Sequence, residues 1–232
     1  MLSQGINIWG GEQFAPLFGA IKRFFTPLQS SLTQHYTFPE VVLAGDFEIE
    51  TSIVFGSLGG HIVCHRGEEK SDRIAVLNNQ LLVAGTLIGS FIDTNFTSDD
   101  KLHLLRVDRV GTLVSVYLNG VFQTSGTFSA TLFLNTVGGR IDESITTSVP
   151  YFSGILANVK ITNGTTLTHD LPLDEDFALT SIAVNKGTLG AAGNATTVNI
   201  TESELFTLHT ETDPDEWRNF DDTIIIPIAP RA

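Results

Sequence analysis

The chain has few of the features that identify a protein class by themselves. Cys64 is the one cysteine among 232 residues, so no disulfide can form within the chain. Lysine and arginine number 13 against 26 aspartates and glutamates, which gives a formal net charge of −13 at pH 7. A protein that binds nucleic acids or anionic membranes needs clustered Lys and Arg, whereas this chain is strongly acidic. No apolar run approaches the roughly 18 residues that a membrane-spanning helix needs. The composition excludes a disulfide scaffold and argues against a nucleic-acid partner or membrane insertion.

Aromatic residues other than phenylalanine are also scarce. The chain has 16 phenylalanines, 2 tryptophans and 3 tyrosines. Sugar-binding sites need an exposed aromatic ring to stack on the sugar, with amide or carboxylate groups for the hydroxyls. Trp9 and Trp217 lie near the two ends, and we expect Tyr117 to pack inside a hairpin. This composition favours protein–protein packing over sugar stacking.

The residues that are present predict one all-β domain. Hydrophobic residues make up 42% of the chain and 21 residues are glycine, enough for a core with many turns. In Asp46–Phe55, apolar Phe47, Ile49 and Ile53 alternate with polar neighbours, which predicts a strand with one buried face. Similar short runs recur every 8 to 12 residues or so, separated by Gly and Asn, without helical crossovers. This spacing is typical of an antiparallel β-sandwich.

The most informative segment is Asp99–Gly126. Leu105 and Val107 alternate with charged neighbours, and a second apolar run then meets Asn119-Gly120 before the chain returns. Asn-Gly between two such runs is the strongest short-range signal for a β-hairpin, because a type I′ turn needs positive φ at both central residues. We therefore predict a hairpin that turns at Asn119-Gly120.

This segment resembles the laminin-G-like members of the concanavalin A-type jelly rolls, in which a similar strand runs into a hairpin ending in Asn-Gly or Asp-Gly. Tyr151–Ile161 is similar to a strand near the end of the same family, and the two matches cover roughly residues 45–170. The resemblance implies an antiparallel jelly-roll sandwich, with calcium as the family's commonest ion. Animal extracellular members often carry a disulfide near the C-terminal end. Its absence here favours assembly in a reducing cytoplasm.

We expect the sandwich to span residues 36–210, flanked by an N-terminal arm over residues 1–35 and a C-terminal arm over residues 211–232. Apolar residues recur every three or four positions from Phe14 to Leu28, which predicts a helical or else an extended arm. Proline within the Ile-rich tail suits an edge strand or an exchanged arm. The residues we expect to dock in assembly are Phe14, Leu17, Phe18, Ile21, Phe24, Phe25, Trp217, Ile224 and Ile226.

The ionisable residues do not form a catalytic motif. Glycoside hydrolases share the jelly-roll fold, but Glu48 and Glu50 lack the third carboxylate of such a motif, and we interpret them as solvated strand residues. The six histidines match no zinc or nucleophile pattern. For calcium, the candidate ligands are Asp72 and Asp142. We predict no enzyme and no required cofactor.

These observations favour a structural protein of a virus particle, because viral proteins fold in the host cytoplasm and act outside it. We expect a head-decoration or tail-associated protein of a tailed bacteriophage that forms a homo-oligomer, taken as a trimer, and contacts other virion proteins. The start of the sequence shows no signal-peptide pattern, which agrees with synthesis in the host cytoplasm. The first alternative is a carbohydrate-binding host-attachment module, and the second is a glycan-cleaving enzyme. Fold resemblance does not decide among them.

Overall fold

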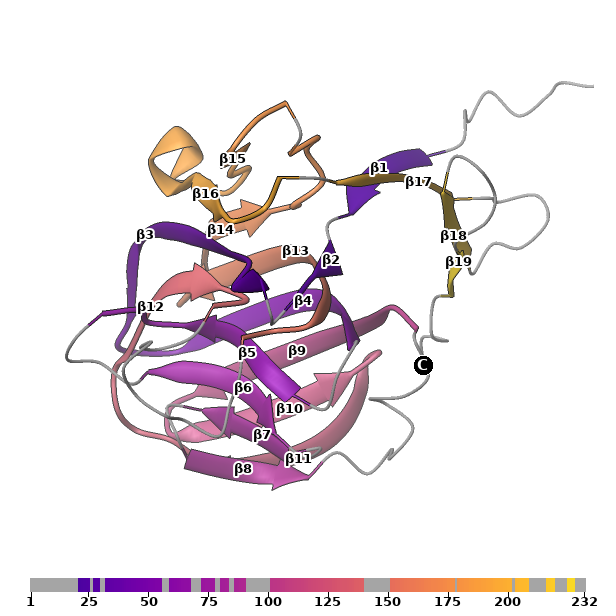
Figure 1. Cartoon of the computed structure of the whole chain (residues 1–232). Helices are drawn as coiled ribbons and strands as arrows, with labels where there is room; N and C mark the ends of the chain where they lie inside the picture. The colour runs from indigo at the N-terminus through magenta and orange to yellow at the C-terminus, as the bar shows by residue number, and fades with distance from the viewer. Residues whose placement is uncertain are drawn as a thin grey trace, which may run out of the picture.

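The computed structural model is an antiparallel β-sandwich with a small third sheet beside it (Figure 1). No α-helix occurs among the residues that it describes. The expected all-β sandwich fold is therefore confirmed. No helix in the described part of the chain is long and apolar enough to cross a membrane. The structure describes residues 21–25, 27–29, 32–55, 59–67, 72–77, 80–83, 86–90, 101–139, 151–177, 179–201, 203–208, 216–219 and 225–227.

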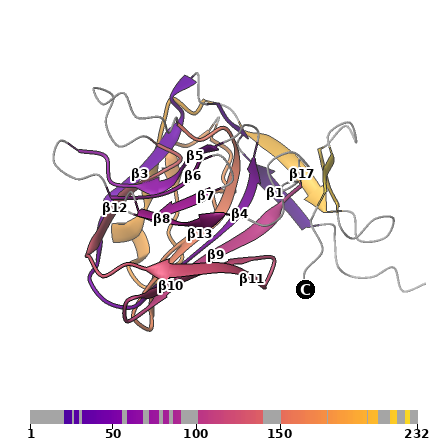
Figure 2. The same ribbon diagram turned by 90° about the horizontal axis from the view of Figure 1, so that it is seen from below.

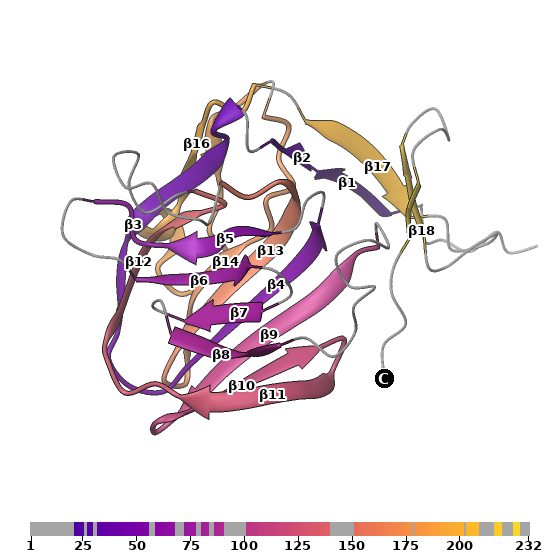
Figure 3. The same cartoon turned by 60° about the horizontal axis from the view of Figure 1, so that its bottom comes forward.

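The first sheet is antiparallel and carries the hairpin in the order β11-β10-β9-β4-β13-β14 (Figure 3). The short strand β2 adds to it by pairing with β13. Its strands are β11 (Val121–Thr127), β10 (Leu113–Leu118), β9 (His103–Val110), β4 (Phe47–Phe55), β13 (Gly154–Asn163), β14 (Thr166–Leu171) and β2 (Pro27–Leu28).

The second sheet packs over the first in the order β15-β16-β3-β12-β5-β6-β7-β8 (Figure 2). At one margin of the sandwich β8 lies against β11. A single turn of 3₁₀ helix, Gly190–Gly193, precedes β16. The strands are β15 (Ile182–Ala183), β16 (Ala195–Val198), β3 (His35–Leu43), β12 (Leu132–Val137), β5 (Gly59–Cys64), β6 (Arg73–Leu77), β7 (Gln80–Val83) and β8 (Thr86–Ser90).

The core lies between the two sheets, where alternate residues of each strand meet. Successive side chains of a strand point to opposite faces, so the apolar positions of the alternating pattern all face inward. Burying one Val, Leu or Ile side chain contributes about 1.5–3 kcal/mol. The fully buried positions include Ile49, Ile53, Leu105, Val107, Val114 and Val116 of the first sheet, and Leu43, Ile74, Val76, Leu132 and Leu134 of the second.

The predicted hairpin joins β10 to β11. Asn119 and Gly120 have φ values of 53° and 87°, as a type I′ turn requires. The Asn119 side chain also accepts a hydrogen bond of 2.8 Å from the backbone N–H of Leu104 on the adjacent strand. The turn is thus tied to β9 as well as to its own two strands, and the hairpin prediction is confirmed.

Of the two forms expected for the N-terminal arm, helical or extended, the structure shows the extended one over residues 21–25 and 27–28. Ile21–Phe25 forms β1, which pairs with β17 (Glu204–Leu208), and Pro27–Leu28 forms β2. Ile and Phe favour strands, and Pro27 cannot continue a helix, so pairing with β17 satisfies the backbone better than a helical turn. The extended form of the arm is therefore the observed one here. Residues 1–20 lie outside the described residues.

The two terminal arms meet in the third sheet. It has the order β1-β17-β18-β19, with β18 at Glu216–Asn219 and β19 at Ile225–Pro227. In Figure 1 these strands lie together beside the sandwich. Each arm supplies at least one strand to a single sheet of the same chain.

Residues next to the expected arm boundary take part in the sandwich. Leu28 is 1% exposed and belongs to the hydrophobic core, and Gln34 and His35 are buried. Cys64 is free and buried, and burial raises the pKa of its thiol to about 12. The boundary at residue 36 stays a prediction.

Candidate functional site

The outward side of the first sheet carries a row of aromatic and charged residues. The strand register places Phe122, Tyr117, Arg106, Glu50 and Lys160 directly beside one another across five strands. These positions alternate with the buried ones, so the pattern that builds the core also places this row in contact with solvent. We call this row, together with Glu48 and Asp108, the outer face.

An aromatic pair forms one end of the outer face. The Phe122 side chain is 52% exposed, and its ring centroid lies 5.7 Å from that of Tyr117 at an interplanar angle of 71°. The Arg106 guanidinium carbon lies 4.1 Å from the Tyr117 ring centroid. An edge-to-face pair and a cation–π contact both hold the rings in place. Phe122 therefore presents a supported apolar surface to solvent.

Ion pairs form the middle of the outer face. Arg106 Nε lies 3.1 Å from Asp108 Oδ1 and 4.0 Å from Glu48 Oε2. Lys160 Nζ donates a hydrogen bond of 3.3 Å to Glu50 Oε1. Burial raises the pKa of the Asp108 carboxyl, because loss of hydration outweighs the attraction of the Arg106 charge. Carboxylate acceptors and guanidinium donors thus lie within reach of the aromatic pair.

A cavity of about 280 Å³ lies beside the ion pairs of the outer face, and Glu48 and Asp108 are among its lining residues. It lies where β4 begins, where β9 ends and beside the turn that follows β13. Asp46 Oδ1 accepts a hydrogen bond of 2.7 Å from the backbone N–H of Gly111, which fixes the carboxylate at this edge. The lining residues are Asp46, Phe47, Glu48, Asp108, Arg109, Val110, Thr162 and Gly164.

Some members of the outer face were predicted correctly and others were missed. Glu48 and Glu50 lie on the solvent side of β4, as the alternation indicated. The third carboxylate of the cluster, Asp108, comes from the neighbouring strand, where it lies opposite Glu48. Tyr117 does contact other side chains, but on the outer face. The signal for its partner was present, since Tyr117 and Phe122 flank the Asn-Gly turn symmetrically.

The residues expected to dock in assembly fall in the third sheet or outside the described part of the chain. Ile21, Phe24 and Phe25 belong to β1, Trp217 to β18 and Ile226 to β19. The other four, Phe14, Leu17, Phe18 and Ile224, lie outside the described residues.

The register of the third sheet aligns three of these residues. Ile21, Leu208, Trp217 and Ile226 occupy one row that crosses all four strands. We call this row the arm row. Its alignment could not be seen in the sequence, because the strands are separated by up to about 180 residues of chain.

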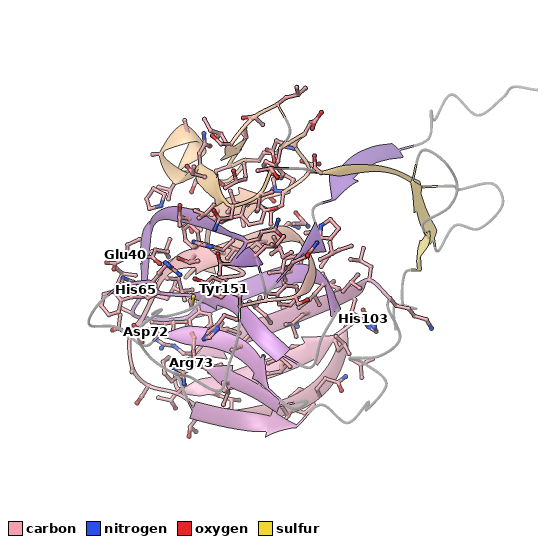
Figure 4. All side chains as sticks on the ribbon, in the orientation of Figure 1. Glu40, His65, Asp72, Arg73, His103 and Tyr151 are labelled. Carbon is pink, nitrogen blue, oxygen red and sulfur yellow. The ribbon has the colours of Figure 1, made fainter. Side chains whose placement is uncertain are left out.

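The candidate calcium ligand Asp72 makes structural hydrogen bonds. Its Oδ2 accepts a bond of 3.3 Å from the backbone N–H of Phe133, and its carbonyl oxygen accepts one of 2.8 Å from the N–H of His65. His65 Nε2 lies 2.9 Å from Glu40 Oε2 in the same part of the second sheet (Figure 4).

Other candidate metal-binding groups are also dispersed. His103 lies at the far side of the sandwich in Figure 4, where its Nδ1 is 3.0 Å from the Asn119 side-chain nitrogen. Asp142 lies outside the described residues. Among the described residues, no group of three His, Cys, Asp or Glu side chains is arranged to hold a metal ion.

No known family model matches the sequence, and no curated protein is similar enough to it to count as a relative. Solved structures do match its fold. A predicted carbohydrate-binding protein from Bacteroides ovatus superposes with a TM-score of 0.57 at 13% identity, over 91% of this chain and 63% of that protein. This chain therefore spans less than two thirds of that protein.

Two further matches are looser. Domains LG4–5 of the mouse laminin α1 chain give a TM-score of 0.42 at 17% identity, covering 62% of this chain and 41% of that one. A heptameric pentraxin from Limulus polyphemus gives 0.38 at 14% identity, covering 60% and 74%. At these identities the comparisons concern the fold alone.

Proposed function

We propose that this chain is a carbohydrate-binding domain whose binding surface is the outer face of the first sheet. The observation that carries the proposal is the exposed Phe122 ring, which packs against Tyr117. Arg106 lies over the other side chain of this pair, Tyr117, and forms ion pairs with carboxylates on the same face. A sugar ring stacks its C–H face on an aromatic ring, while its hydroxyls bond to charged planar groups nearby. The carbohydrate-binding description of the Bacteroides ovatus protein agrees with this function.

The same geometry supports binding better than cleavage. Glycoside hydrolases place an acid and a second carboxylate on either side of the bond that they cleave. Here Glu50 pairs with Lys160, and Asp108 pairs with Arg106. Ion-paired carboxylates are well suited to hold hydroxyl groups in fixed orientations. Any cleaved product in the experiment below would favour the enzymatic alternative instead.

Replacement of Phe122 tests the proposal. We expect Phe122→Ala to weaken binding of the best oligosaccharide by roughly 2- to 12-fold, because one aromatic stacking contact contributes about 0.5–1.5 kcal/mol. The ligand is first found by screening the full chain on an immobilised glycan panel, and affinities are then measured by calorimetry.

The control is Leu179→Ala, which removes another exposed apolar side chain, 85% exposed, on the segment between β14 and β15. It should leave the affinity unchanged. Equal losses in the two variants would remove the outer face from the binding function. A full chain that binds no glycan on the panel would overturn the function itself.

A second candidate function is self-assembly, and the arm row favours it. Four apolar residues in one row give the third sheet a feature suited to contact with another copy of the chain. A structural role in a bacteriophage particle remains a prediction, as does the trimeric state. Carbohydrate binding and assembly are compatible, because they use different sheets.

A further inference from the structure

We propose that the outer face selects neutral oligosaccharides and rejects anionic ones, an inference that rests on the proposed carbohydrate-binding function. The aromatic pair and the cavity, with the ion pairs between them, define one continuous surface. Its length determines the size of the ligand, and its charge determines the ligand's class.

The length of the surface requires more than one sugar unit. Phe122 lies on β11 and Glu48, beside the cavity, lies on β4, three strands further across the sheet. At the usual strand spacing these three steps cover about 14 Å. A single pyranose is about as wide as one aromatic ring and cannot touch both ends. A chain of sugars laid across the strands can stack at Phe122 and place its hydroxyls in the cavity.

The charge of the surface requires a neutral ligand. Three acidic residues, Asp46, Glu48 and Asp108, line the cavity. The cation in the same lining is Arg109, whose Nη1 and Nη2 already donate to backbone carbonyl oxygens. Carboxylates accept hydrogen bonds from sugar hydroxyls, but they repel the carboxylate or sulfate of an acidic sugar at close range. The net charge of −13 adds a repulsive field at longer distance.

The cations of the outer face do not reverse this preference. Arg106 and Lys160, the cations that the structure describes there, lie 3.1 and 3.3 Å from carboxylate oxygens of Asp108 and Glu50. The Arg106 guanidinium also covers the Tyr117 ring. An anionic sugar that approached either cation would also meet the carboxylate with which that cation is paired. A neutral sugar can donate its hydroxyls to the outward oxygens and leave the pairs intact.

The experiment compares two length series with the full chain by calorimetry. The neutral probes are cello-, malto- and N-acetylchito-oligosaccharides of one to six units, and the anionic probes are oligogalacturonides of the same lengths. We expect the affinity for one neutral series to rise with length and then level off. The anionic series should bind at least tenfold more weakly, and its affinity should rise with added salt, because salt screens repulsion.

Two matched variants locate the effect. Glu48→Gln should reduce the difference in affinity between the neutral and anionic series, because it removes a negative charge at the cavity. We call this difference the gap. Glu40→Gln, a residue of similar exposure on the second sheet, should leave the gap unchanged; the two side chains are 44% and 39% exposed. Both variants keep the shape of the side chain, so a difference between them reflects position.

The results separate this inference from the proposed function. If oligogalacturonides bind as tightly as the neutral probes, or a monosaccharide binds as tightly as a hexamer, the inference is overturned while carbohydrate binding stands. If neither series binds and the glycan panel is also negative, the proposed function is overturned and the inference with it.

Discussion

Arg109 is a charged residue that joins the two sheets from inside the sandwich. It is 3% exposed on the core side of β9, where its Nη1 and Nη2 each donate a hydrogen bond of 2.6 Å to the carbonyl oxygens of Ala130 and Ala44. Ala44 lies between β3 and β4, and Ala130 lies between β11 and β12, so both acceptors belong to connections between the two sheets. Its guanidinium also lies over the rings of Phe47 and Phe128.

We predict that Arg109→Met lowers the free energy of unfolding by about 2–3 kcal/mol, because two partly buried charge-assisted hydrogen bonds are lost. Urea denaturation measures the change. Arg106→Met on the outer face is the control and should cost no more than about 1 kcal/mol, since partly exposed ion pairs contribute little. Equal costs for the two variants would contradict the bridging role of Arg109.

Part of this role could be predicted from the sequence. Within β9 the odd-numbered residues face inward, so the alternation of Leu105 and Val107 already places Arg109 on the buried side. The acceptors could not be predicted, because they are backbone carbonyls 21 and 65 residues away. A buried arginine indicates that partners exist, but only the packed sheets determine which atoms they are.

At the level of single elements, the hairpin turn depends on the backbone freedom of Gly120. A Cβ atom at this position would meet no atom within 4 Å, so the cost of a substitution comes from φ alone, which is +87°. We expect Gly120→Ala to destabilise the protein by about 1 kcal/mol, because left-handed backbone is costly for residues with a Cβ atom.

Gly45→Ala is the matched control for Gly120→Ala. Gly45 also has open space around its Cβ position, but its φ lies outside the left-handed region. There alanine should be neutral or stabilising by up to about 1 kcal/mol, because it restricts the unfolded chain. Thermal unfolding measures the stability of both variants. A similar loss of stability in Gly45→Ala would rule out the backbone explanation.

Elements were easier to predict from the sequence than their partners. Alternation identified β4 and β9, and Asn119-Gly120 identified the hairpin, because each signal is local. The register that sets Glu48 opposite Asp108 joins strands about 60 residues apart, and neither strand specifies it alone. Local periodicity also misled at residues 21–25. There the three- and four-residue spacing suggested a helix, but β17 supplied a partner strand.

At the level of the whole molecule, the third sheet explains how two distant arms could act as one surface. Residues directly opposite in register share a face of a sheet, so Trp217 and Ile226 lie on the same face and Ile225 and Arg218 on the other. Any assembly through the arm row should therefore depend on Ile226 and not on its neighbour Ile225.

We predict that the full chain forms a closed homo-oligomer, expected to be a trimer, and that Ile226→Asp dissociates it while Ile225→Asp does not. Closed symmetry is the usual outcome of self-association, and a buried carboxylate in the arm row would carry no partner. Light scattering gives the mass of each variant.

Deletion of residues 1–26 is the complementary change: it removes β1 but spares β2, whose Leu28 is 1% exposed in the core. Its sandwich should stay folded while the mass falls to that of a monomer. A wild-type chain that is already monomeric would remove the arm row from assembly, and carbohydrate binding would then be the function left to test.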